Sequence, residues 1–186
     1  MTKIREKGFT LIELLVVVSV LLISVGVAGD LVVTIIRSYN KTRSLNEVEQ
    51  NGNYALAKLS YDLKNARSLT SPTALGSSNL VTMVDQAGDS ITYTIESASG
   101  LGSAGSPCGS VIAVTRSVNG ASKEPITNCD NTEGVTINVL VSSFQLVSVS
   151  PYTFAITIYF AVPSSQVSQS AGSYFRTSVV MLGASY

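Results

Sequence analysis

The feature that most constrains this 186-residue chain is an apolar run of 21 residues, from position 9 to position 29. As an α-helix the run is about 31 Å long, which matches the hydrocarbon core of a bilayer. Glu13 is its only charged residue, and its other polar side chains are three hydroxyls. The run therefore predicts a membrane-spanning helix, and Asp30 then falls at the far interface.

Three basic residues precede the run, Lys3, Arg5 and Lys7, and only Glu6 opposes them. Basic residues beside a first apolar helix stay on the cytoplasmic side of the membrane. We therefore expect a single-pass membrane protein with its N-terminus in the cytoplasm and the rest of the chain outside.

Two ordinary kinds of membrane segment fit this run. A secretory signal would be cut after it, and Gly26-Val27-Ala28 offers a small-x-small site that would release a soluble exported protein. A plain signal-anchor would stay uncut and would hold a monomeric surface-binding module. Neither explains Glu13, because a carboxylate in the apolar region is costly and leucine would serve both functions better.

The residues around Glu13 resemble the cleavage and methylation signature of type IV pilins and pseudopilins. The signature is KGFTLIELL at positions 7–15, which combines a basic leader, Gly, Phe, a Thr-Leu-Ile run, Glu and a long apolar helix. The resemblance implies that a membrane-embedded prepilin peptidase cuts after Gly8 and methylates the new amino terminus at Phe9. Residues 1–8 would then be a leader peptide, and the apolar helix would be kept.

The same resemblance supplies a role for Glu13. Cleavage creates a positive amine on Phe9, four residues before Glu13 and on the same helical face. In a bundle of such helices the amine of one subunit can meet the carboxylate of its neighbour, where low dielectric favours a pair over unpaired charges. We therefore expect Glu13 to be an assembly residue that sets the register of helices in a filament.

Beyond the bilayer segment, apolar residues recur at steps of three and four. This spacing predicts one long helix over about residues 9–68, amphipathic in its second half and stopped by Ser71-Pro72. We assign 9–36 to the transmembrane and assembly helix, and 37–70 to an amphipathic helix that packs on a head domain. The expected apolar stripe is Leu45, Val48, Gly52, Ala55 or Leu56, Leu59, Leu63 and Ala66, and between them lie Glu47, Glu49, Lys58, Asp62, Lys64 and Arg67.

After Pro72 the pattern changes to period two with many β-branched residues, which predicts strands. Residues 80–84 and 90–95 flank a Gln-Ala-Gly-Asp turn and predict a hairpin. Asn119-Gly120 is a strong hairpin signal after a strand at 111–118, and Pro125 restricts its partner to a sheet edge. Further strands are expected at 135–141, 144–149, 152–162 and 174–182. The fold class is therefore α+β, one long N-terminal helix packed on a mostly antiparallel sheet, with a β-rich head of residues 71–186.

The order of these segments resembles the larger minor pilins and the J-type pseudopilins. The resemblance lies within residues 91–182 and rests on the segments VTRSVNG, PIT, FQLV, TFAITIYFAV and YFRTSVVML. It implies that the chain is a minor pilin or a J-type pseudopilin.

The chain has two cysteines, Cys108 and Cys129. Both lie in the part that is expected outside the cytoplasm, where an even number of cysteines favours a disulfide over two free thiols. Closing a loop of this length is worth about 3 kcal/mol by chain-entropy arguments.

Composition excludes several classes of function. The chain has no His, which removes the usual general base and the commonest metal ligand. Only nine charged residues follow Arg67, so no basic patch is present for nucleic acid. The G-x-G-x-x-G match at 100–105 is followed by a loop instead of a helix, and the acidic loop at 130–133 does not have EF-hand spacing. We expect no enzymatic activity, no cofactor, no metal and no direct nucleic-acid binding.

These observations predict a structural subunit of a type IV filament-type machine. The expected partners are the prepilin peptidase, other pilins or pseudopilins and an inner-membrane assembly platform. The subunit would be a single-pass membrane protein before assembly and would then reside in a pilus or pseudopilus. Three machines share such an N-terminus: type IV pili, competence pseudopili for DNA uptake and type II secretion pseudopili.

Overall fold

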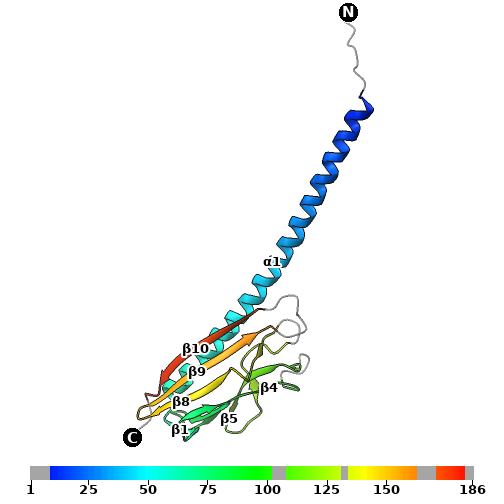
Figure 1. Cartoon of the computed structure of the whole chain (residues 1–186). Helices are drawn as coiled ribbons and strands as arrows, with labels where there is room; N and C mark the ends of the chain where they lie inside the picture. The colour runs from blue at the N-terminus through cyan, green and yellow to red at the C-terminus, as the bar shows by residue number, and fades with distance from the viewer. Residues whose placement is uncertain (1–8, 102–107, 131–133, 163–170, 183–186) are drawn as a thin grey trace, which may run out of the picture. The chain divides into compact units, whose positions relative to one another are not determined.

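The computed structural model describes residues 9–101, 108–130, 134–162 and 171–182 (Figure 1). The chain divides into two compact units, residues 1–40 and 41–186. One helix, α1 (Leu11–Asn65), begins in the first unit and ends in the second, where it packs with antiparallel strands. The predicted α+β class is confirmed.

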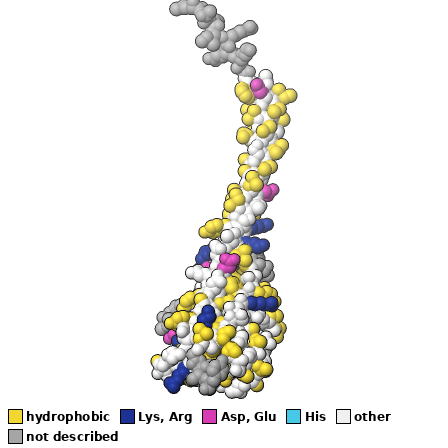
Figure 2. Space-filling model, turned by 90° about the vertical axis from the view of Figure 1, so that its left-hand side faces the viewer, with side chains coloured by type: hydrophobic (Ala, Val, Ile, Leu, Met, Phe, Trp, Pro, Cys, Tyr) yellow, Lys and Arg dark blue, Asp and Glu magenta, His cyan; other side chains and the backbone are white. Residues whose placement is uncertain are grey.

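In the first unit α1 is exposed on every side, and Figure 2 shows apolar side chains along this part of the helix. The helix has the length and apolar composition needed to cross a membrane. Its hydroxyls are satisfied locally, because Ser19, Ser24 and Thr34 each donate to the carbonyl four residues earlier at 2.8 Å. Such bonds allow polar side chains to lie in hydrocarbon without an unmet hydrogen bond.

In the second unit one face of α1 is buried, as the apolar spacing predicted. Two details of the prediction are wrong. Leu45 is 36% exposed while its neighbour Ser44 is buried, and the charged Asp62 lies on the inner face. The residues of α1 that are buried are Ser44, Val48, Gly52, Ala55, Leu59, Asp62 and Leu63.

The helix also ends at Asn65, before the predicted end at residues 68–70. After Asn65 the chain turns, and the Arg67 amide donates to the Val84 carbonyl at 2.7 Å. This bond starts a strand, β1 (Ser68–Ser71), that pairs with β3 (Leu80–Val84). Pairing with a distant strand therefore ends the helix before Pro72 is reached.

The strands form two antiparallel sheets, where the sequence predicted one. In the first sheet both predicted hairpins are present. The Asp85 carboxylate accepts bonds from the amides of Ala87 and Asp89 in one turn. In the other turn Asn119 and Gly120 both have positive φ. After this turn the chain pairs with the preceding strand over only two residues, one of which is Pro125, at the edge of the sheet. The order of this sheet is β1, β3, β4 (Ser90–Ser97), β5 (Ile112–Val118) and β6 (Glu124–Pro125).

The second sheet contains the longest ladder, nine residue pairs between the two strands nearest the C-terminus. The predicted strand at 135–141 is only two residues long, because Asn138 turns the chain by accepting bonds from the amides of Leu140 and Val141. A short strand at residues 76–78 was not predicted. The order is β10 (Gly172–Val180), β9 (Tyr152–Ala161), β8 (Ser143–Val149) and β2 (Gly76–Ser78), and β7 (Thr136–Ile137) also pairs with β9.

Both sheets and the inner face of α1 share one hydrophobic core. Strand β9 shows how the core is built, because every second residue from Phe154 to Phe160 is buried. Alternation with period two is the pattern of a strand with one face inward. The largest fully buried side chains are Tyr93, Phe144, Phe154, Phe160, Leu59, Leu63, Met83 and Leu146.

A disulfide joins Cys108 to Cys129, with 5.0 Å between the two Cα atoms. Next to it the Gly109 amide donates to the Cys129 carbonyl at 3.3 Å. Around the bridge lies a second, small apolar cluster that includes Ala98 and Val111. The disulfide thus connects the segment before β5 with the segment between β6 and β7.

Gly52 allows α1 to approach the second sheet closely. A Cβ atom at this position would lie 2.5 Å from two carbons of the Phe175 ring of β10. The ring cannot move freely, because it stands edge-on against Phe160 with centroids 5.6 Å apart. Packing therefore favours glycine here, despite its poor helix propensity.

We predict that Gly52→Ala lowers the melting temperature of the full-length protein in detergent. Overpacking a core costs about 1–3 kcal/mol, which outweighs the gain of about 1 kcal/mol that alanine brings in a helix. Asn53→Ala, at the next and exposed position of the same helix, is the matched control and should not lower it. A higher melting temperature for Gly52→Ala would show that Phe175 moves aside without cost.

Candidate functional site

The start of α1 is closed by a reciprocal pair of polar residues. Helix α1 begins at Leu11, so Thr10 is its N-cap and Glu13 is the third helical residue. The Thr10 hydroxyl accepts from the Glu13 amide at 3.4 Å, and the Glu13 carboxylate accepts from the Thr10 amide at 3.5 Å. The Thr10 hydroxyl and the same carboxylate oxygen also lie 3.4 Å apart. This is a capping box, which satisfies amides that a helix start leaves without partners.

The capping box fixes where the Glu13 carboxylate lies. It is held back toward the amino end of the helix, within one turn of Phe9, where the helix dipole favours negative charge. Phe9 itself precedes the helix and is 72% exposed. The Thr-x-x-Glu spacing could have predicted this local role of Glu13, which the sequence analysis missed. Gly8, the expected cleavage position, lies outside the described residues.

The surface around these residues is apolar all round. From Leu11 to Ile36 every large apolar side chain of α1 is exposed. A helix that is apolar on all sides is stable only when a bilayer or other helices cover it. The arrangement therefore presents an acid at one end of an apolar helix that needs such a cover.

Residues 3–29 match the family model of the prokaryotic N-terminal methylation motif. The motif indicates a type IV pilin-like precursor, processed by prepilin peptidase. Together with the apolar helix, it fits a membrane-anchored pilin precursor. No curated protein and no solved structure gave a significant match to the chain.

The head contains a buried polar cluster that sequence reasoning missed. The Asp62 side chain is only 6% exposed, and it accepts a hydrogen bond of 2.6 Å from the Tyr93 hydroxyl. Its carboxylate also lies 3.3 Å from Nε of Arg116 on β5 and 3.5 Å from Nζ of Lys58. The cluster therefore ties α1 to β4 and β5. Burial raises the pKa of Tyr93, and the hydrogen bond to Asp62 raises it further, so the phenol stays protonated.

We predict that Asp62→Ala destabilises the head strongly. Removing one member of a buried ion pair costs about 3–5 kcal/mol, because the remaining partners lose their counter-charge. The loss of the 2.6 Å bond in Tyr93→Phe should cost less, about 1–3 kcal/mol. The measurement is chemical unfolding of the full-length protein in detergent.

Lys58→Ala is the control for this series, because it removes the half-exposed pair within the helix and a contact with the exposed Tyr61 ring but leaves Asp62 bonded to Tyr93 and Arg116. Such pairs contribute about 0.3–0.5 kcal/mol. An Asp62→Ala variant that is no less stable than Lys58→Ala would show that the cluster does not hold the helix to the sheet.

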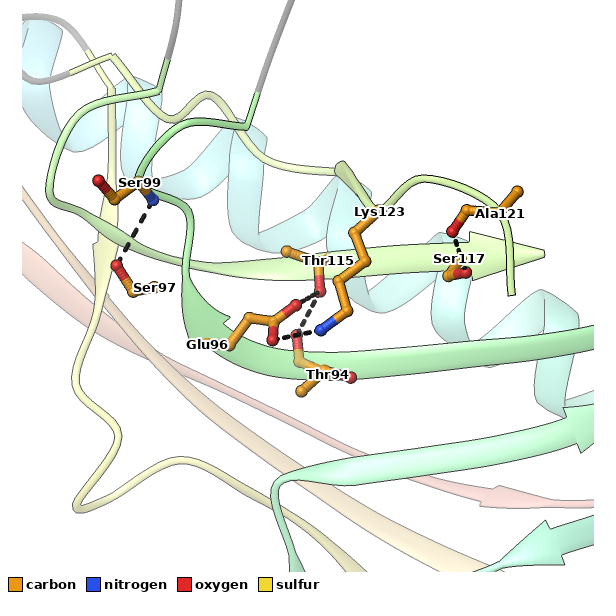
Figure 3. A network of polar contacts seen from close by, with 8 residues as sticks. All are labelled: Thr94, Glu96, Ser97, Ser99, Thr115, Ser117, Ala121 and Lys123. Atoms are coloured by element: carbon orange, nitrogen blue, oxygen red, sulfur yellow. Dashed lines mark hydrogen bonds and ion pairs between the residues drawn. The ribbon is translucent and has the colours of Figure 1, made fainter. Parts of the chain in front are cut away.

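A second polar cluster lies on β4 and β5 (Figure 3). The Glu96 carboxylate accepts a bond of 2.6 Å from the Thr115 hydroxyl, and its other oxygen lies 2.6 Å from the Lys123 ammonium. The Thr115 hydroxyl also lies 3.3 Å from the Thr94 carbonyl. Burial acts to raise the pKa of Glu96, but the hydrogen bonds from Lys123 and Thr115 and the charge of Lys123 outweigh it and lower the pKa.

A lowered pKa in the folded state means that ionised Glu96 stabilises the head. This contribution is complete above the ordinary pKa of 4.5 and is lost as the pH falls through the lower folded value. We predict that the difference in melting temperature between the parent and Glu96→Gln is constant from neutral pH down to about pH 5 and shrinks below it. Glu124→Gln, at an exposed acid of the edge strand, controls for the loss of one charge. A difference that grows at acid pH would contradict the assignment.

Proposed function

We propose that this chain is a minor pilin or pseudopilin, a structural subunit that joins a type IV filament-type machine through its N-terminal helix. The match of residues 3–29 to the methylation motif carries the proposal. The competing hypothesis is a monomeric surface-binding module on an uncleaved signal-anchor, in which Glu13 would only cap the helix.

Processing comes first in the proposed sequence of events. The prepilin peptidase cuts after Gly8, removes the leader 1–8 and methylates the amine of Phe9. The helix of residues 9–36 stays in the membrane with its N-terminus toward the cytoplasm, and the head lies outside. The retained apolar surface is what distinguishes this processing from a secretory cut after Ala28.

Assembly then uses Glu13. The capping box supports this role, because it holds the carboxylate at the amino end of the helix, where an amine from a neighbour can approach. A carboxylate has about four acceptor sites, so it can keep its bond to Thr10 and accept from a second donor. In an apolar bundle the amine of Phe9 from a neighbouring subunit would find few other partners.

The head supports the finer assignment to minor pilins or J-type pseudopilins. The segments that resemble them lie on or beside strands β5, β6, β8, β9 and β10. In the proposed layout residues 37–70 connect the membrane helix to the head and 71–186 form its sheets. The expected partners are the peptidase, other pilins or pseudopilins and an inner-membrane assembly platform.

We predict that Glu13→Leu is inserted in the membrane and cut after Gly8 as in the parent, but enters filaments poorly. Insertion is favoured because a charge leaves the apolar run. Incorporation falls because the neighbour's amine loses its partner, at a cost of about 3 kcal/mol or more. The measurements are membrane level, the mass of the mature N-terminus and co-purification with sheared filaments.

Glu13→Gln separates the two roles of this residue, because glutamine can complete a capping box but carries no charge. If charge pairing drives assembly, both variants should lose incorporation. Normal incorporation of Glu13→Gln would assign Glu13 to helix capping alone. If the leader remains attached in cells with an active peptidase, Phe9 has no free amine. That result would support the plain anchor and refute the proposal.

A further inference from the structure

An open cavity lies in the second unit, where one face of α1 meets the segment between β6 and β7. Its volume is about 330 Å³, which is within the range of about 300–1,000 Å³ for pockets that bind small molecules. Four of the residues that line it follow at steps of three and four along α1, so they share one face of the helix. The lining residues among those that the structure describes are Glu47, Gln50, Asn51, Tyr54 and Asn128.

Hydrogen bonds and the disulfide hold the walls of this cavity together. Asn51 uses both ends of its side-chain amide, because Oδ1 accepts from the Asn128 amide at 2.7 Å and Nδ2 donates to the Glu47 carbonyl at 2.9 Å. The Asn128 carbonyl in turn accepts from the Val135 amide at 2.9 Å, and the next residue, Cys129, belongs to the disulfide. The cavity therefore lies between a helix and a cross-linked loop, and a site that is already ordered loses little entropy when a ligand binds.

Two side chains of the cavity have polar groups that the head does not use. Within the described part of the chain, the side chains of Gln50 and Tyr54 make no hydrogen bond, ion pair or ring contact. Both are exposed, Tyr54 by 57%. They are one helical turn apart, so one ligand can contact the amide and the ring together. The amide offers a donor and an acceptor, and the tyrosine offers an apolar ring with a hydroxyl at its end.

The charge and polarity of the lining narrow the class of ligand. None of the five described lining residues is basic and Glu47 is an acid, so phosphates, nucleotides and other anions are disfavoured. Tyr54 is the only large apolar side chain among these five, so a hydrocarbon chain would stay mostly uncovered. A metal ion would meet a single carboxylate, which lies 3.8 Å from Nε of Arg43. A neutral molecule with several hydroxyls and one apolar face fits all of these limits.

We propose that this cavity binds a neutral saccharide, with one sugar ring against Tyr54 and sugar hydroxyls bonded to Gln50 and Glu47. The C–H groups on one face of a sugar ring fit the electron-rich face of an aromatic ring. A carboxylate only accepts hydrogen bonds and an amide both donates and accepts, so Glu47 and Gln50 together match hydroxyls in different orientations. A free sugar and the end of a glycan polymer share this chemistry. The inference goes beyond the proposed function, because it concerns the head of one copy and needs no filament.

The test is saturation-transfer difference NMR on the full-length protein, in a detergent whose headgroup is not a sugar. The probes are glucose, galactose, mannose and N-acetylglucosamine, and a disaccharide of each. We expect the parent to bind at least one of them. Tyr54→Ala and Gln50→Ala should each weaken that binding by about tenfold, or 1.4 kcal/mol. Both variants should keep the melting temperature of the parent, because both side chains are exposed.

Tyr61→Ala is the matched control, since it removes another exposed tyrosine of the same helix that does not line the cavity. It should bind the same probe as tightly as the parent. Pull-down with insoluble cellulose, chitin and peptidoglycan separates the two sources of saccharide. Retention that Tyr54→Ala abolishes assigns the cavity to a glycan polymer, and binding of a soluble probe without such retention assigns it to a free sugar.

The inference is overturned if no soluble probe and no polymer binds, if either cavity variant binds as the parent does, or if Tyr61→Ala loses binding to the same extent. Binding of inorganic phosphate that Gln50→Ala abolishes would also overturn it, because the cavity would then be an anion site. Cleavage after Gly8 and filament entry that depends on Glu13 are measured separately, so the proposed function can stand in each of these cases.

Discussion

Helix α1 must be covered in two different ways along its length, and the rest of the structure depends on this constraint. Its first part is apolar on all sides, and its second part is apolar on one side only. The head meets the second requirement, because two sheets and the inner face of the helix enclose one core. The first requirement is met by a bilayer or by other helices, and the proposed function uses both.

Polar groups in both parts of the helix are satisfied close to where they occur. In the first part, hydroxyls bond to carbonyls one turn back, and Thr10 and Glu13 cap the helix start. In the second part, the buried carboxylate of Asp62 is met by Tyr93 and Arg116 from the first sheet. An unpaired polar group in an apolar environment is costly, so these bonds allow the helix to serve membrane and head without local unfolding.

Charges at the ends of an otherwise apolar surface can set register without adding much to stability. This is the role that we propose for Glu13 with the Phe9 amine. Apolar side chains alone permit many offsets between parallel helices. A charge pair between neighbouring helices leaves few of these offsets, which is what a regular filament needs.

The sequence by itself determined the parts that depend on local spacing. The apolar run, the methylation motif, the inner stripe of α1, both hairpins and most long strands follow from periods of 3.6 and two and from turn residues. The Thr-x-x-Glu spacing of Thr10 and Glu13 also predicts the capping box.

Only the tertiary structure decided the features that need a distant partner. Strands β1 and β2 are short and rich in serine, and they exist because β3 and β8 pair with them. The same pairing ends α1 at Asn65, and Asn138 divides a run that looked like one strand. Asp62 lies seven residues after Ala55 and three after Leu59, so its spacing places it on the inner stripe, but the partners that satisfy its charge there, Tyr93 and Arg116, lie 31 and 54 residues away. No local pattern encodes such contacts, because each depends on which strands come together in the sheets.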